Sequence, residues 1–186
     1  MPSPDDFPDW VLRIVRPGDV LPDGAAAMDR AVALGLASIA SSGGGPFAAL
    51  ITTAAGRVVS IGWNVVIPTH DPTAHAEVTA IRRAGAALDT WAIGSTEPLT
   101  LWTTCAPCLM CTGAIHWAGI ARVVAATYAD DAEAIGFREG PAGCDAAMHL
   151  RALGVAYEEG VERERALELF RRYAGPIYDG RTPAGS

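Results

Sequence analysis

The sequence predicts an α/β fold in which helices cover both faces of one β-sheet. Short apolar runs that are typical of buried strands alternate with longer segments whose apolar residues recur at helical spacing. The chain has 186 residues, of which 50% are hydrophobic and 19% are charged. This length and composition suit one globular domain with a substantial core.

The first half of the chain contains an arm, a helix and a hairpin. Residues 1–24 are rich in Pro and Asp, and we expect them to form an irregular N-terminal arm. Residues 25–40 carry apolar side chains at helical spacing, and the glycines and the proline that follow end this helix. Two apolar segments, 47–52 and 58–66, flank a short turn and are predicted to pair as a hairpin.

Helices and strands alternate in the second half. A polar loop over 68–74 leads into a helix over 75–87, which carries one apolar stripe. A strand is predicted over 99–104 and a helix over 108–118, which begins just after a proline. Residues 122–127 form the next predicted strand.

The last part of the chain is predicted to close the domain and to leave a tail. Residues 130–145 form a long irregular stretch, and irregular stretches of this length are usually functional or disordered. A last strand over 155–157 and a last helix over 163–173 follow. We therefore expect the domain to span 25–174, with a C-terminal tail over 175–186.

Charge and cysteine content limit the expected partners and compartment. The 14 basic residues are all arginines, and 21 acidic residues give a net charge of −7, which disfavours binding to phosphate backbones. The first residues do not form a secretory signal, and polar residues interrupt the charge-free segment 31–56 before it could span a bilayer. We expect a cytoplasmic protein with no nucleic-acid or membrane partner, whose four cysteines are thiols or metal ligands.

Two short motifs supply a set of zinc ligands. His75-Ala-Glu77 stands at the start of one predicted helix, and Pro107-Cys108-Leu-Met-Cys111 stands at the start of another. Two cysteines three residues apart share one helix face, and the positive end of a helix favours their thiolate forms. One imidazole and two thiolates leave the fourth position of zinc open to water, so Zn²⁺ is the expected cofactor.

A carboxylate beside the expected metal indicates hydrolytic chemistry. Zinc lowers the pKa of a bound water from about 15.7 to about 7. Glu77 lies two residues after His75 and is predicted to carry protons without binding the metal. His-x-Glu together with Pro-Cys-x-x-Cys is the signature of zinc-dependent deaminases. The alternative is a structural zinc site that Cys105 or Cys144 closes as a fourth ligand.

At these residues the chain resembles the cytidine-deaminase-like superfamily, and most closely the bacterial guanine deaminases. The resemblance implies a three-layer α/β/α fold around a five-stranded mixed sheet, and a homodimer. Ala106 departs from the family, which usually has Glu before the Pro-Cys pair. The segments that carry the resemblance are Gly44-Gly-Pro-Phe47, Asn64, Asp71-Pro-Thr-Ala-His-Ala-Glu-Val-Thr-Ala-Ile81, the Pro-Cys-x-x-Cys motif, Ala114-Ile-His-Trp117, Asp131-Ala-Glu-Ala-Ile-Gly-Phe137-Arg-Glu139 and Ala174-Gly-Pro-Ile-Tyr178.

The resemblance also implies residues that bind the substrate. Asn64 matches a position whose amide hydrogen-bonds the base, although it could instead be a turn residue that ends the strand. Phe47 and Trp117 match aromatic residues that sandwich the ring, with ordinary core packing as the alternative. Glu139 matches a second acid that acts on the amine, with a solvated loop charge as the alternative. Tyr178 matches a residue of the tail that covers the site.

The leading interpretation is a guanine deaminase that converts a free small-molecule nucleobase to xanthine and ammonia. The same machinery serves cytosine, an s-triazine such as ammeline, an aminopurine or a nucleoside, because pocket shape sets the choice of base. A tRNA-editing adenosine deaminase shares the signature, but the acidic charge disfavours it. A zinc-stabilised binding or toxin-immunity module without catalysis would leave Glu77 without a role.

Overall fold

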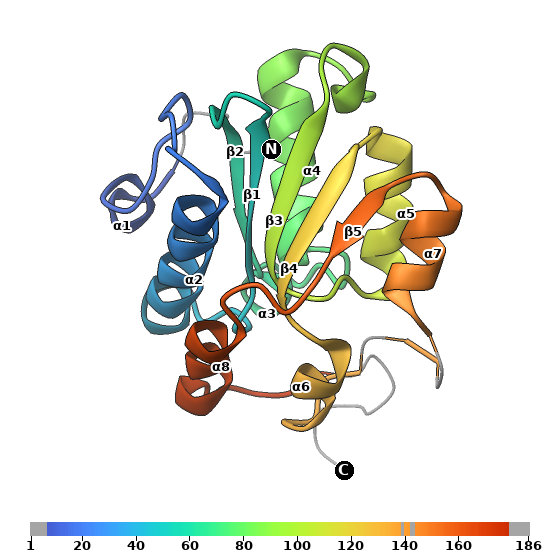
Figure 1. Ribbon diagram of the computed structural model, residues 1–186. Helices are drawn as coiled ribbons and strands as arrows, with labels where there is room; N and C mark the ends of the chain where they lie inside the picture. Colours follow the sequence, from blue (N-terminus) through green and yellow to red (C-terminus); the bar gives the residue numbers. More distant parts are fainter. Residues whose placement is uncertain (1–6, 139, 142–143, 179–186) are drawn as a thin grey trace.

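A five-stranded mixed sheet forms the middle layer of the fold (Figure 1). The structure is a computed structural model that describes residues 7–138, 140–141 and 144–178. In the strand order β2-β1-β3-β4-β5, β1 is antiparallel to both β2 and β3, whereas β4 is parallel to both β3 and β5. The strands are β1 (Ala48–Thr53), β2 (Val58–Trp63), β3 (Leu99–Cys105), β4 (Arg122–Thr127) and β5 (Ala156–Glu158).

Helices cover both faces of the sheet, so the predicted three-layer α/β/α fold is confirmed (Figure 1). Helices α2 (Gly24–Ser41) and α8 (Arg163–Arg172) lie on one face, with α1 (Asp9–Leu12) beside α2. The opposite face carries α4 (Ala76–Leu88), α5 (Leu109–Ala118) and α7 (Ala146–Ala152). The connections contain α3 (Val66–Thr69), α6 (Ala129–Glu133) and a 3₁₀ turn at Ile93–Ser95. In the described part of the chain, no helix combines the length and the hydropathy that a membrane crossing requires.

Several short elements differ from the sequence prediction. The described part of the predicted irregular arm contains α1, whose Val11 is fully buried. Strand β2 ends at Trp63 and not at residue 66, because the next residues turn into α3. The stretch 130–145 includes most of α6, and α7 was not predicted. These helices span one or two turns and depend on caps, such as the Asp145 carboxylate that accepts from Met148 N.

The sheet separates two apolar cores because side chains alternate along its strands. Ala49 and Ile51 of β1 belong to the core under α4 and α5, together with Ile115. Leu50 of the same strand belongs to the core under α2, together with Met28. The central strands are therefore buried on both faces, which explains why their sequences are continuous apolar runs.

Helix α4 lies in direct backbone contact with β2 at Gly62. A Cβ atom at this position would lie 2.1 Å from the carbonyl oxygen of Ala76 and 2.5 Å from the amide nitrogen of Ala80. Neither backbone atom can move without shifting the whole helix. Gly62 therefore sets how closely α4, which begins with His-Ala-Glu, approaches the sheet.

We expect Gly62→Ala to lower the free energy of unfolding by about 3 kcal/mol or more, because the added methyl group would force α4 off the sheet. Urea denaturation followed by circular dichroism measures this change. Gly113→Ala in α5 is the control, since a Cβ atom there meets nothing within 4 Å. That substitution should be neutral or stabilise the fold by about 0.5–1 kcal/mol. Equal stability of the two variants would contradict the prediction.

Candidate metal and catalytic site

The two predicted motifs meet where α4 and α5 begin. His75 is the residue that precedes α4, and Cys108 is the residue that precedes α5. The Cys108 sulfur accepts a hydrogen bond from the amide of Cys111, with a Sγ–N distance of 3.5 Å. Both helices thus direct their positive N-terminal ends toward the same group of side chains, which stabilises negatively charged sulfur there.

The side chains of His75, Cys108 and Cys111 form a metal-binding geometry. One ligand atom from each residue lies within 4.8 Å of the other two, and Nδ1 of His75 is 3.5 Å from Sγ of Cys108. Within the described chain, this group contains neither of the two cysteines considered as a fourth ligand. Cys105 instead directs its sulfur to the carbonyl oxygen of Tyr128, at 3.6 Å. One imidazole nitrogen and two thiols fit zinc, which leaves the fourth position for water.

The two thiols of this group differ in their tendency to ionise. Hydrogen bonds from Cys111 and His75 hold the pKa of the Cys108 thiol well below its usual value. The Cys108 sulfur and burial raise the pKa of the Cys111 thiol. A zinc ion binds both sulfurs as thiolates, so its binding is coupled to the release of a proton.

Glu77 is a buried carboxyl group beside the metal ligands. It lies in the first turn of α4, is 6% exposed, and lines the same pocket as His75. Burial, and next the charge of Cys108, raise the pKa of Glu77 to about 7. A carboxyl group with this pKa can hold or release a proton at neutral pH, which is the property that a general acid and base needs. Bound zinc would lower this pKa through its positive charge.

A small pocket adjoins this group. Its remaining volume is about 10 Å³, which is close to the minimum for one water molecule. Phe47 lines it and is also a core residue, because its ring packs edge-on against Phe137 and Phe170 at centroid distances of 5.0 and 5.9 Å. The lining residues are Phe47, Asn64, His75, Ala76, Glu77, Cys105 and Ala106.

The side-chain amide of Asn64 is held in one orientation. Its Oδ1 accepts from the backbone amides of Gly45 at 3.2 Å and Val66 at 3.3 Å, which fixes the side on which its NH₂ group can donate. A Cβ atom at Gly44 would lie 1.8 Å from the carbonyl oxygen of Asn64. The glycines before Phe47 therefore allow the chain to pass close to Asn64 and to fix its amide.

Tyr178 of the C-terminal tail contacts two residues that line the pocket, Asn64 and His75. Its hydroxyl accepts a hydrogen bond from Nδ2 of Asn64 at 2.5 Å. Its ring contacts Phe137 edge-on at a centroid distance of 5.3 Å and lies 6.1 Å from the ring of His75. Phe137 thus links Tyr178 to Phe47, a role that sequence reasoning missed. The signal was one aromatic residue in a loop otherwise rich in acidic and small residues.

One predicted substrate contact, Trp117, is not among the residues that line this pocket. Trp117 lies on α5 with 72% of its surface exposed, and its ring contacts His116 at a centroid distance of 5.7 Å. Its contact with a substrate ring opposite Phe47 stays a prediction. Glu139 lies outside the described residues.

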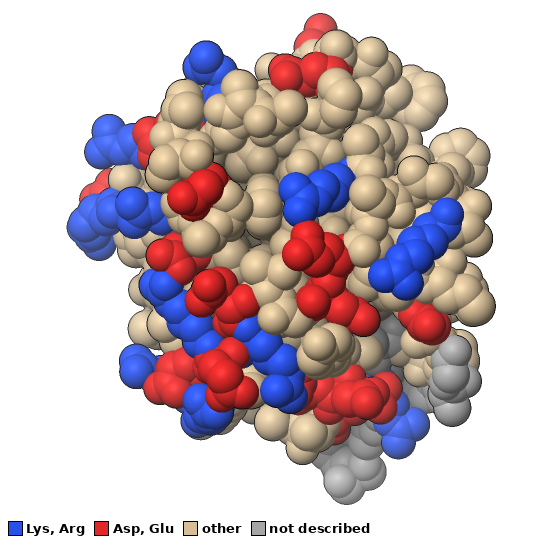
Figure 2. Space-filling view, viewed as in Figure 1, with Lys and Arg blue, Asp and Glu red and all other residues tan. Residues whose placement is uncertain are grey.

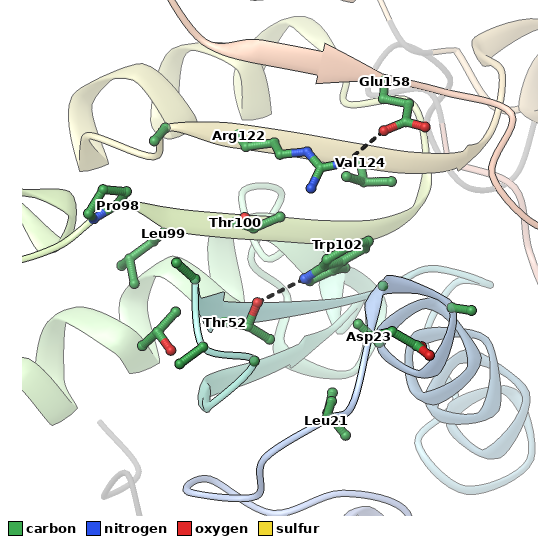
Figure 3. Close-up of a pocket in the computed structure, with 18 of the residues that line it drawn as sticks. Leu21, Asp23, Thr52, Pro98, Leu99, Thr100, Trp102, Arg122, Val124 and Glu158 are labelled. Carbon is green, nitrogen blue, oxygen red and sulfur yellow. Dashed lines mark hydrogen bonds and ion pairs between the residues drawn. The ribbon is translucent and has the colours of Figure 1, made fainter.

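A larger cavity of about 740 Å³ lies on the opposite side of the sheet, beside the start of α2 (Figure 3). Trp102 forms part of its wall and donates from Nε1 to Thr52 Oγ1 at 2.9 Å. Arg122 and Glu158 form an ion pair of 2.8 Å at its edge. Because none of the predicted site residues lines it, the small pocket beside the metal ligands is the better candidate for catalysis.

Comparisons with known proteins agree with this geometry. Residues 23–127, more than half of the chain, match the family of the cytidine and deoxycytidylate deaminase zinc-binding region. Over 110 residues the chain is 42% identical to the guanine deaminase of Bacillus subtilis (strain 168). This match covers 59% of the present chain and 68% of that relative. A solved structure of guanine deaminase from Nitrosomonas europaea superimposes with a TM-score of 0.83 at 35% identity, covering 90% of this chain and 93% of that one.

A further relative matches a shorter region. The chain is 43% identical over 75 residues to the tRNA-specific adenosine deaminase of Buchnera aphidicola subsp. Schizaphis graminum. This match covers 40% of the chain and 48% of that relative, so it spans about half of that protein's length. The predicted resemblance to deaminases and the predicted zinc cofactor are thus confirmed.

Removing either thiol of the metal group should remove the metal. We expect Cys108→Ser and Cys111→Ser to lower the zinc content from one ion per chain to near zero, because a neutral hydroxyl is a poor zinc ligand. Inductively coupled plasma mass spectrometry of purified protein measures the content. Cys105→Ser and Cys144→Ser are the controls and should retain zinc. Loss of zinc in either control would instead indicate a site closed by four protein ligands.

Proposed function

Because the chain belongs to the cytidine and deoxycytidylate deaminase zinc-binding family, we propose that it hydrolyses the exocyclic amine of a free nucleobase, with guanine as the leading substrate. The observation that carries this proposal is the buried Glu77 carboxyl, which lines one pocket with the metal ligand His75 and the amide of Asn64. Guanine is favoured because the Bacillus subtilis and Nitrosomonas europaea relatives, at 42% and 35% identity, are guanine deaminases.

The chemistry divides between the metal and one carboxylate. Zinc held by His75, Cys108 and Cys111 would activate a water molecule for attack on the amine-bearing carbon. Glu77 takes a proton from this water and passes it to the adjacent ring nitrogen. It then carries the second proton of the water to the departing amine, so that the carbon–nitrogen bond breaks and ammonia leaves. For guanine the reacting carbon is C2 and the product is xanthine.

The substrate would be held by pocket residues that do not bind the metal. The NH₂ group of Asn64 would donate to an acceptor on the base, because its oxygen is already bonded to two backbone amides. The ring of Phe47 forms the wall beside it. For Glu139 we propose contact with the leaving amine, where a second carboxylate would assist proton transfer. The predicted stacking of Trp117 on the base has no support within one chain, since the Trp117 side chain is exposed.

Other amino-substituted rings are the first alternative. Cytosine, ammeline, an aminopurine or a nucleoside could use the same metal and the same Glu77, because the contacts to the ring edge select the base. A tRNA substrate has less support. On the face that Figure 2 shows, basic side chains lie beside acidic ones. The ion pairs of the described chain include Arg163–Asp131 and Arg172–Glu168. Arginines paired in this way offer little free positive charge to a phosphate backbone.

We propose a homodimer of chains, each with one domain over 25–174, acting in the cytoplasm. Exposed apolar side chains on α5 and α7 support a surface for a second copy: Leu109 and Trp117 lie eight residues apart on one side of α5, and Met148 lies on α7. The cytoplasmic location is proposed because two of the four cysteines are assigned to the metal group and none of the four is paired in a disulfide.

The proposed substrate is tested by ammonia release from zinc-loaded protein with guanine, cytosine, adenine, ammeline, guanosine and cytidine. We expect guanine to give the highest kcat/KM, by about tenfold or more, because a pocket shaped for one ring edge leaves polar groups unpaired with another. Glu77→Gln should keep the zinc and the fold but lower kcat by about 10²-fold to 10⁴-fold. A pyrimidine or triazine as best substrate would refute guanine while keeping the zinc chemistry. Full activity of Glu77→Gln would refute the mechanism.

The tail should affect turnover because Tyr178 occupies the amide that the base would use. We expect Tyr178→Phe to lower KM for guanine by about fivefold, since the hydroxyl no longer competes for Asn64 Nδ2. Tyr178→Ala should lower kcat by about tenfold, because no ring then closes the pocket against water. Steady-state kinetics separates the two effects. If removal of residues 175–186 leaves both kcat and KM unchanged, the tail has no role in the site.

A further inference from the structure

Asn64, whose amide is proposed to bind the base, directly follows Trp63, and several contacts hold Trp63 in place. Trp63 is the last residue of β2, is 5% exposed, and immediately precedes Asn64. The backbone amide of Asn64 continues the pairing with β1, donating to the carbonyl oxygen of Phe47 at 3.0 Å. Any shift of Trp63 along or across the sheet therefore moves Asn64 relative to the metal ligands.

Side chains of α4 hold this end of β2 by hydrogen bonds to its carbonyl oxygens. The Thr79 hydroxyl is shared between the carbonyl oxygens of Trp63, at 3.0 Å, and Ala76, at 2.9 Å. One turn later the guanidinium of Arg83 donates to the carbonyl oxygen of Ile61 at 2.8 Å. Thr79 and Arg83 follow His75 at successive intervals of four residues. These two hydrogen-bond donors, together called the clamp, therefore lie on the same side of the helix as the metal ligand.

The ring of Trp63 is enclosed by a cation and by the N-terminal arm. The guanidinium carbon of Arg83 lies 4.0 Å from the centroid of the Trp63 ring and 5.3 Å from that of Phe7. Trp10 packs edge-on against Trp63 at a centroid distance of 5.1 Å. Burial lowers the pKa of Arg83 to about 10, yet the group remains a cation at neutral pH and binds the electron-rich ring face.

We propose that Trp63, clamped by Thr79 and Arg83, is a positioning residue that sets where Asn64 presents its amide to the base. Thr79 and Arg83 lie on α4, which also carries Glu77 and follows His75. Their hydrogen bonds to β2 therefore fix the position of Asn64 relative to His75 and Glu77. Phe7 and Trp10 of the N-terminal arm also pack against the Trp63 ring. The arm thereby has a role in substrate binding, although it does not line the pocket. This inference depends on the proposed function of the pocket.

Thr79→Val tests the clamp because it removes the hydroxyl and nearly keeps the volume. We expect KM for guanine to rise about tenfold while kcat changes less than about threefold and the zinc content stays the same, since the base loses its oriented partner. Thr79→Ser restores the hydroxyl and should restore KM. Arg83→Met should raise KM similarly. Thr96→Val, which removes a hydroxyl bonded to the Ile93 carbonyl away from the site, should leave both constants unchanged.

A double-mutant cycle distinguishes positioning from general destabilisation. In an Asn64→Ala background, Thr79→Val should have no further effect on kcat/KM, because the residue through which it acts is gone. A merely structural role would instead lower the melting temperature and the fraction of active enzyme at unchanged KM. Additive effects of the two substitutions, or an unchanged KM in both Thr79→Val and Arg83→Met, would overturn the inference.

A readout without turnover separates this inference from the proposed function. Nuclear magnetic resonance of ¹⁵N-labelled protein reports the side-chain amide of Asn64, identified by its loss in Asn64→Ala. We expect its signals to shift in Thr79→Val and to return in Thr79→Ser. If the wild type deaminates no nucleobase, the proposed function fails, whereas unshifted Asn64 signals in Thr79→Val would show that the clamp does not position this amide.

Discussion

Three ligand atoms must meet at one point, and this requirement determines how the rest of the site is built. The ligands come from the first residues of α4 and α5, so both helices must lie on the same face of the sheet and start at the same end of it. The parallel pairing of β3 and β4 provides this arrangement for α5, which connects them. The approach of α4 depends on Gly62, because any side chain there would hold the helix away from β2.

The same arrangement explains why Glu77, the proposed general acid and base, is a buried residue. Glu77 is in the first turn of α4, two residues after the metal ligand His75, and its side chain is buried. Burial, and next the charge of Cys108, raise its pKa to about 7, and the positive charge of a bound zinc ion would lower it again. An exposed carboxylate at the same distance from the metal would be ionised at neutral pH and would be a poorer proton donor to the leaving amine.

Sequence reasoning identified most of the fold and the metal ligands because both depend on local patterns. The spacing of His75, Cys108 and Cys111 and the alternation of strands and helices are visible in the chain itself. The missed features depend on tertiary contacts. Helix α7 has only two turns, the orientation of the Asn64 amide depends on glycines 19 and 20 positions earlier, and Trp117 carries an aromatic ring whose exposure no local pattern reveals. Short amphipathic segments and single side chains take their environment from the assembled fold.

The parts of the site differ in how firmly they are fixed, and this difference bears on substrate choice. The metal ligands and Glu77 belong to two helices packed on a central sheet, whose relative placement is fixed by backbone contact. The residues proposed to contact the base lie outside the helices: Asn64 follows a strand, and Tyr178 ends the described chain. Substitutions in these segments can change the shape of the pocket while leaving the metal in place. Related chains can therefore keep one hydrolytic reaction and accept different rings, and residues that connect the two parts, such as Trp63, control how well the ring is aligned with the metal.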